Sequence, residues 1–153
     1  MKPSFNEFVQ NYIRPLVQRP EALQTAALCY RYTKTGAKQV LLITSRGTGR
    51  WVIPKGWTMR GMDAAGAALV EAWEEAGVRP AATPIAPIGH FLYRKIKSSG
   101  LPVRVKVLVY PVEVATLKDE FPEANQRTRR WVSPDEAASM VAEPGLQSIF
   151  RQM

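Results

Sequence analysis

Valines alternate with other residues from Val103 to Val109, and this period of two is typical of a β-strand with one face in the core. A continuous apolar run from Val40 to Ile43 instead indicates a strand that is buried on both faces. The same reasoning predicts strands over residues 23–33, 39–45, 51–53, 88–96, 103–110 and 127–132.

Helices are predicted at both ends of the chain. Apolar residues recur near helical spacing in residues 4–13, which indicates an N-terminal helix. Ser133, Pro134 and Glu136 suit the N-cap, N1 and N3 positions of a second helix, which is expected to end near residue 143. A last helical turn is expected within residues 146–153. At 153 residues, the chain is expected to form one domain, with residues 1–22 as an N-terminal helical extension.

Between these elements, an alanine-rich stretch without proline predicts a helix that begins after Asp63 as N-cap and ends before Gly77. Its carboxylates fall on one face at helical spacing, and they are Glu71, Glu74 and Glu75. An apolar stripe on the opposite side is expected to seat the helix on the core, through Met62, Leu69, Trp73 and Ala76.

Like charges at this spacing weaken an isolated helix by roughly 0.2–0.5 kcal/mol per pair, so a compensating partner is expected. Two interpretations fit the acidic face. It is either a divalent-cation site, because Mg²⁺ prefers oxygen ligands, or a solvated surface.

Six residues stand at the spacings of the Nudix box, G-x5-E-x7-R-E-U-x-E-E-x-G-U with U an apolar residue: Gly56, Glu71, Glu74, Glu75, Gly77 and Val78. The preceding residues 51–57 resemble the strand and loop that enter this box. From about residue 24 to residue 143 the chain resembles Nudix hydrolases, especially the branch similar to diphosphoinositol polyphosphate phosphohydrolases. Two positions depart from the pattern, because Met62 stands for the first Glu of the box and Val70 for its Arg.

The resemblance implies an α/β fold, a Nudix-type α/β/α sandwich with a mixed β-sheet. It implies Mg²⁺ or Mn²⁺ as cofactor, held by Glu71, Glu74 and Glu75 with a contact from the Gly56 carbonyl. Either Glu71 or Glu75 is then the catalytic base. Family members also recruit a carboxylate from outside the box, and Glu120 and Glu123 are the candidates here.

Charge along the chain points to an anionic substrate. Residues 63–78 carry four acidic and no basic side chains, whereas residues 79–112 carry six basic and none acidic, and the net charge is +8. A polyanion whose phosphates bridge a metal and basic side chains suits this distribution. The candidate substrate-binding residues are Arg31, Arg46, Arg50, Lys55 and Arg60.

We therefore expect a metal-dependent hydrolase of phosphoanhydride bonds, with an inositol pyrophosphate or a dinucleoside polyphosphate as the favoured type of substrate. Nucleoside triphosphates, ADP-ribose and capped RNA ends stay open. A Nudix-derived phosphate-binding module with little catalysis is the alternative, motivated by Met62 and Val70. A third interpretation, RNA binding through net charge, is not favoured, because the motifs of the common RNA-binding modules are missing.

Composition adds the cellular context. Apolar content of 46% and charged content of 22% are ordinary for a globular protein. One cysteine, Cys29, allows no internal disulfide and lies in a strand pattern, so a buried thiol is expected. Without an apolar span or a signal peptide, a cytoplasmic protein is expected, with no membrane or nucleic-acid partner. Monomer and homodimer both stay open.

Overall fold

The computed structural model describes residues 22–153, and these form a mixed sheet with helices on both of its faces. The strands are β1 (Ala22–Tyr32), β2 (Lys38–Thr44), β3 (Trp51–Val52), β4 (Lys55–Trp57), β5 (Val78–Pro80), β6 (Gly89–Ile96), β7 (Pro102–Leu117) and β8 (Arg129–Val132). The helices are α3 (Ala64–Ala76), α4 (Pro134–Met140), α5 (Pro144–Arg151) and the short 3-10 helix η2 (Ala124–Gln126).

The two long strands β1 and β7 lie side by side at the centre of the sheet and run parallel, from Ala22 opposite Val105 to Tyr30 opposite Glu113. The main path through the sheet has the order β3-β2-β1-β7-β5, while β4 pairs with β1, β6 with β7 and β8 with β2. The pairs that β1 forms with β2 and with β4 are antiparallel, so the sheet is mixed. The predicted fold class is confirmed.

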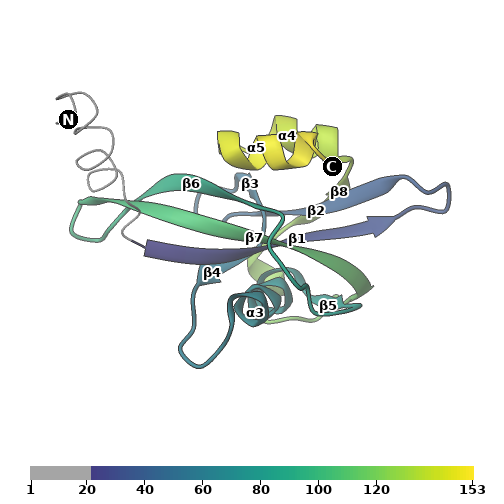
Figure 1. Cartoon of the computed structure of the whole chain (residues 1–153), viewed down its shortest axis with the longest axis horizontal. Coiled ribbons are helices and arrows are strands. Elements are labelled where there is room, and N and C mark those ends of the chain that lie inside the picture. Colours follow the sequence, from purple (N-terminus) through teal and green to yellow (C-terminus); the bar gives the residue numbers. More distant parts are fainter. Residues whose placement is uncertain (1–21) are drawn as a thin grey trace, which may run out of the picture.

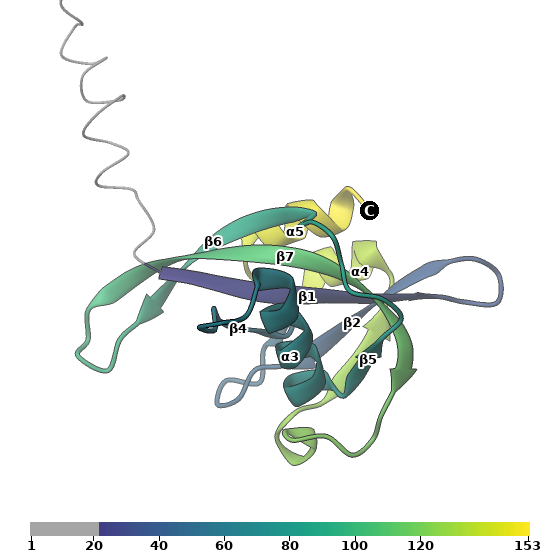
Figure 2. The same ribbon diagram turned by 60° about the horizontal axis from the view of Figure 1, so that its bottom comes forward.

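Helices cover the two faces of the sheet unequally. In Figure 1 the α4–α5 pair lies above the strands and α3 lies below them, and in Figure 2, which brings this lower face forward, α3 lies in front of β1. Alternate residues of β1 belong to two separate clusters: Leu28 packs on the α4–α5 side and Cys29 on the α3 side. The sheet therefore separates two cores.

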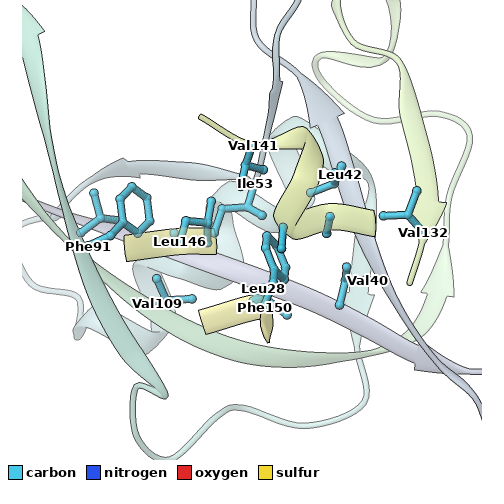
Figure 3. Packing of buried hydrophobic residues seen from close by; sticks show 14 of the residues in the cluster. Leu28, Val40, Leu42, Ile53, Phe91, Val109, Val132, Val141, Leu146 and Phe150 are labelled. Atoms are coloured by element: carbon cyan, nitrogen blue, oxygen red, sulfur yellow. The ribbon is translucent and has the colours of Figure 1, made fainter. Parts of the chain in front are cut away.

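Large side chains fill the core on the α4–α5 side. Phe150 and Leu146 of α5 are fully buried against Leu28, Val109 and Phe91, as Figure 3 shows. On the α3 side the contacts of the helix come mostly from alanine. Its core-facing residues are Ala65, Ala68, Ala72 and Ala76, and the partly buried Leu69 packs beside them.

The predicted ends of α3 are confirmed. Asp63 caps the helix by accepting a 2.7 Å hydrogen bond from the Gly66 backbone, and Gly77 ends it at a φ of 71°. The predicted apolar stripe is wrong in part, because Met62 is 43% exposed and Trp73 is only partly buried, with the Arg79 guanidinium 3.7 Å from its ring centroid. Alanine, the smallest side chain of the stretch, forms the seat instead.

Other predictions need smaller corrections. Residues 55–57, expected as a loop, form β4, because Gly56 pairs with Thr25 of β1. The strand predicted over 103–110 continues to Leu117 as β7, past Pro111, because its pairing with β1 and β5 goes on. Ser133 caps α4 as predicted, by accepting a 3.1 Å hydrogen bond from Glu136, but α4 ends at Met140 rather than near residue 143.

The Cys29 thiol is fully buried, as predicted, and burial raises its pKa to about 12. The predicted N-terminal helix over residues 4–13 lies outside the described residues, so it stays a prediction. The same holds for the helical extension predicted over residues 1–22, except that its last residue, Ala22, begins β1. Within residues 22–153, no helix has both the length and the apolarity that a membrane span requires.

Candidate active site

A cleft of ≈ 760 Å³ opens between α3, the β3–β4 segment, the β6 strand and the loop that carries η2. It brings together acidic, basic and aromatic side chains from distant parts of the sequence. The residues that line it are Gln24, Ser45, Arg46, Val52, Lys55, Gly56, Trp57, Glu71, Glu74, Glu75, Tyr93, Lys95, Pro122, Glu123 and Arg127.

All three predicted carboxylates of α3 line this cleft. They differ in burial, because Glu71 and Glu75 are buried whereas Glu74 is exposed. The alanine seat is consistent with this difference: because most of the residues that α3 packs on the sheet are alanines, the helix lies close enough for Glu71 and Glu75 to share its buried side. The predicted acidic face is thus partly an interior face.

Gly56 and Glu71 lie in direct contact. A Cβ atom added to Gly56 would come within 2.2 Å of Oε1 and 2.3 Å of Cδ of Glu71, so only glycine leaves room for this carboxylate. The position of Gly56 follows from the pairing of β4 with β1, in which Gly56 stands opposite Thr25. Gly56, the first residue of the motif, and Glu71, fifteen residues later, therefore meet in the cleft.

The carboxyl groups of Glu71 and Glu75 hydrogen bond to each other. Burial raises the pKa of Glu75 to about 8, and the nearby Glu71 and Glu123 add to the rise while Arg127 opposes it. Burial also raises the pKa of Glu71, with a further contribution from Glu74. Without a cation beyond Arg127, this pair holds a proton near neutral pH, because two adjacent buried carboxylates repel each other when both are ionised.

Arg127 supplies the one guanidinium that reaches a carboxylate of α3 among the ion pairs of residues 22–153. Its Nη2 lies 3.2 Å from Oε1 of Glu75 and 3.1 Å from Oε1 of Glu123. Its Nη1 donates a 3.1 Å hydrogen bond to the carbonyl of Thr44 in β2. Sequence reasoning missed this residue, and its only signal was a basic side chain in the segment that leads to β8.

Glu123 is the carboxylate that the structure adds from outside the motif. It lines the cleft, and its backbone N–H donates a 3.0 Å hydrogen bond to the Glu74 carbonyl near the end of α3. Of the two candidates that the sequence offered, Glu120 is exposed and does not line the cleft.

Two of the predicted substrate-binding cations, Lys55 and Arg46, line the cleft. Lys55 lies with its Nζ 5.4 Å from the ring centroid of Tyr93. Burial lowers the pKa of Lys55, although Glu75 and Glu143 raise it in part. Arg46 lies at the rim with its Nη1 3.2 Å from Oε1 of Glu123.

The structure does not bring the other three cations to the cleft wall. Arg31 lies seven residues beyond Gln24 on β1, about 23 Å away at 3.3 Å per residue, with its guanidinium 4.1 Å from the Trp131 ring centroid. Arg50 forms a 2.8 Å ion pair with the buried Glu143. Arg60 lies exposed in the turn before α3.

Aromatic and basic side chains also line the cleft. Trp57 is 45% exposed, and the Lys95 ammonium lies 4.9 Å from its ring centroid. The Tyr93 hydroxyl donates a 2.7 Å hydrogen bond to Oε1 of Gln24. Sequence patterns assign Tyr93 and Lys95 only to a strand, because their place at the cleft depends on the pairing of β6 with β7.

The donor chemistry of the cleft fits a hard divalent cation, because its acidic ligands are carboxylate oxygens whose mutual repulsion the protein leaves in part uncompensated. No three His, Cys, Asp or Glu side chains in residues 22–153 form a ready metal site. The contacts explain this, since Glu75 is engaged by Arg127 and Glu71 lies against Gly56.

Comparison with known proteins gives a consistent result. The family model of the NUDIX domain matches residues 22–153. An Ap4A hydrolase from C. elegans is 21% identical at a TM-score of 0.59, with 86% of this chain and 94% of that chain covered. The dihydroneopterin triphosphate pyrophosphohydrolase of E. coli is 14% identical at a TM-score of 0.64, covering 88% and 95%.

The NUDIX domain of Shewanella oneidensis NrtR, complexed with ADP ribose, is 19% identical at a TM-score of 0.61, covering 98% of this chain and 97% of that chain. At these identities the similarity establishes a shared fold. A search among curated proteins gives no match.

Proposed function

The chain belongs to the Nudix family and is a hydrolase of phosphorus-containing acid anhydrides, and from this premise we propose that its cleft cleaves a polyphosphorylated substrate with the help of Mg²⁺ or Mn²⁺. The observation that carries the proposal is the convergence of Glu71, Glu74, Glu75 and Glu123 with Lys55 in one cleft. Carboxylates at one end and an ammonium beside them match the charges of a metal-bound diphosphate.

Glu71, Glu74 and Glu75 would hold the cation, with a contact from the Gly56 carbonyl. When bound, the cation lowers the pKa of a water molecule and offsets the charge on the phosphates. The contact between Glu71 and Gly56 supports this assignment, because it brings the glycine backbone to the carboxylates.

Glu71 or Glu75 takes the proton from the attacking water. A general base works best when its pKa lies near the working pH. Burial raises the pKa of Glu75 to about 8 in the absence of a cation, and a bound cation would lower it. Glu71 shares its hydrogen bond, so the two carboxyl groups are poised to exchange a proton. We assign them jointly as the acid–base pair.

Lys55 and Arg46 are the proposed phosphate contacts. Lys55 and Lys95 are the cleft cations for which residues 22–153 show no ion pair, and an ammonium without a carboxylate partner is available to a phosphate oxygen. Arg50 would act indirectly, because it forms an ion pair with Glu143. Glu143, together with Glu75, raises the pKa of Lys55. Arg31 and Arg60 are the least supported of the proposed contacts.

For the substrate we propose an inositol pyrophosphate or a dinucleoside polyphosphate. Lys95 of β6 supports a substrate with more than one phosphate, because it adds a second ammonium to the cleft beside Lys55. The C. elegans protein with the same fold is an Ap4A hydrolase.

The test is a phosphate-release screen with Mg²⁺ over inositol pyrophosphates, dinucleoside polyphosphates, nucleoside triphosphates and ADP-ribose. We expect turnover that requires the cation and that the Glu74→Gln/Glu75→Gln double variant loses at least a hundredfold. Turnover and Mg²⁺ affinity that are both unchanged in this variant would contradict the proposal.

The second candidate is a phosphate-ligand binding module with little catalysis. It is favoured by Met62 and Val70, which replace two polar groups of the motif. The same screen separates the two functions. A binding module would show ligand-dependent thermal stabilisation without turnover, also after Met62→Glu and Val70→Arg are introduced together.

A further inference from the structure

We propose that Arg127 is the positioning residue of the carboxylate cluster, and that it supplies from outside the motif the guanidinium that the motif itself lacks at Val70. This inference rests on the proposed function, because it assigns Arg127 to the same cleft. It makes Arg127 a residue that acts through Glu75 and Glu123 rather than on the substrate.

The position of Arg127 is fixed by neighbouring backbone. Its side chain is 7% exposed, and its Nη1 binds the Thr44 carbonyl. The next residue, Thr128, exchanges two hydrogen bonds with Thr44, because its N–H donates to Oγ1 at 2.8 Å and its carbonyl accepts from the Thr44 N–H at 3.0 Å. The guanidinium therefore reaches the carboxylates from a rigid strand junction.

A single nitrogen of this guanidinium joins two parts of the site. Nη2 lies 3.2 Å from Glu75 on α3 and 3.1 Å from Glu123 in the loop that carries η2. Ionised carboxylates this close would repel each other and move apart without a cation between them. Arg127 thus sets the distance between the motif carboxylate and the one from outside it.

The motif offers no substitute for this contact. Its arginine position is Val70, and its first glutamate position is Met62, which is 43% exposed. Nε of Arg127 is buried without a hydrogen-bond partner in residues 22–153, which costs free energy. The cost is understandable if the side chain is oriented to serve the carboxylates.

Arg129, two residues further along at the start of β8, provides a matched control. It donates to the carbonyls of Ala76 at 3.0 Å and Lys118 at 2.7 Å, and it pairs with Asp119. These contacts fasten the C-terminal end of α3 and do not involve the cleft carboxylates. Arg129 therefore has the structural role from which the role of Arg127 must be distinguished.

The experiment compares Arg127→Met, Arg127→Lys and Arg129→Met with the wild-type protein. Mn²⁺ alone is the first probe, because its EPR spectrum reports both affinity and the order of the bound ion. We expect Arg127→Met to bind Mn²⁺ at least as tightly as wild type, since a nearby positive charge is removed, but with a changed spectrum that shows a less ordered site. Arg129→Met is expected to lower the melting temperature and keep the wild-type spectrum.

Turnover of the best substrate from the screen is the second readout. We expect Arg127→Met to lower kcat at least tenfold with little change in KM, and Arg127→Lys to lie between, because an ammonium restores the charge without the planar fork. An unchanged Mn²⁺ spectrum in Arg127→Met, or full wild-type behaviour of Arg127→Lys, would overturn the proposal. If wild type has no turnover, the proposed function fails, and the Mn²⁺ spectra still decide the role of Arg127.

Discussion

The two faces of the central sheet are formed by the same strands but are covered by helices with different side chains. On the α4–α5 face, large side chains such as Phe150 and Leu146 are fully buried. On the α3 face the helix packs through Ala68, Ala72 and Ala76, and the space under it admits two carboxyl groups. Apolar burial is worth about 25 cal/mol per Å², so the first face contributes more to stability. The α3 face buries less apolar side-chain area, and Glu71 and Glu75 occupy part of its interior instead.

This difference shows that small residues on α3 position the carboxyl groups of the candidate active site. A helix seated on methyl groups lies close to the sheet, and its glutamates then reach Gly56 and Arg127 rather than bulk water. Desolvation follows from the same close packing, and it is the main cause of the raised pKa of Glu75. Mutations on the α4–α5 face should therefore change mainly the free energy of unfolding. Mutations on the α3 face should change mainly kcat and the dependence of stability on pH and metal.

The largest effect on stability is expected on the α4–α5 face. Phe150→Ala should lower the free energy of unfolding by about 3–5 kcal/mol, because it empties a fully buried aromatic site. Denaturant unfolding measures the loss, and the kcat per folded molecule should stay near wild type. A proportional loss of kcat in the folded fraction would mean that the two faces are not separable.

The pH dependence of the metal-free protein tests the α3 face. The pKa of Glu75 rises from an ordinary 4.5 to about 8 on folding, so the folded state favours the protonated carboxyl group. This contribution is complete below about pH 4.5 and is lost as the pH rises through about 8, at up to about 1.4 kcal/mol per pH unit. Unfolding in EDTA from pH 5 to 9 should show the decline.

Two variants sharpen that measurement. Glu75→Gln should flatten the decline, because glutamine does not titrate, whereas Glu74→Gln, at an exposed position, should keep it. Stabilisation by Mg²⁺ should increase over the same pH range, since a ligating carboxylate must lose its proton. Identical pH profiles for wild type and Glu75→Gln would show that Glu75 is not the titrating group.

Two glycines give a matched comparison of the faces. Gly56→Ala should displace the flexible Glu71 carboxyl group, which a Cβ would approach within 2.2 Å, and lower kcat at least tenfold, equivalent to about 1.4 kcal/mol, with little change in melting temperature. Gly145→Ala should lower the melting temperature with little change in kcat, because its Cβ would meet the Cβ of Phe91 at 2.6 Å in the core. Steady-state kinetics and thermal unfolding of both variants measure these effects. Equal effects of the two variants on kcat would contradict the predicted difference between the faces.

The smallest effect is expected at the start of α3. Asp63→Ala removes the side chain that accepts from the Gly66 N–H, and loss of an N-cap costs about 1 kcal/mol. The loss should be the same with and without Mg²⁺, because Asp63 does not line the cleft. Thermal unfolding in EDTA and in Mg²⁺ measures it, and a much larger loss in Mg²⁺ would place Asp63 in the metal site.

Local signals along the chain predicted a large part of this fold. The caps at Asp63, Gly77 and Ser133 were readable because each acts on backbone groups a few residues away. The valine alternation predicted the core strand β7, and the motif spacing predicted that Glu71, Glu74, Glu75 and Gly56 meet. The caps and the alternation depend on neighbours within one turn or one strand, whereas the meeting of Gly56 with Glu71 was implied by the family resemblance.

Long-range features were not predictable in this way. Arg31 was predicted from its charge, yet it lies far along β1 beside Trp131. Arg50 forms an ion pair with Glu143, whose position depends on where α5 begins. Met62 fitted an apolar stripe but remains exposed, because alanines seat the helix. Arg127 had no motif at all, since its contacts to Thr44, Glu75 and Glu123 cross three elements.

The amino-acid order alone therefore determined the elements, their caps, the acidic motif and the family. Which side of α3 is buried, which cations reach the cleft and which arginine serves Glu75 were decided only when the strands paired. The reason is physical: helix and turn preferences act over about four residues, whereas burial and charge pairing depend on how β1, β2, β7 and β8 come together.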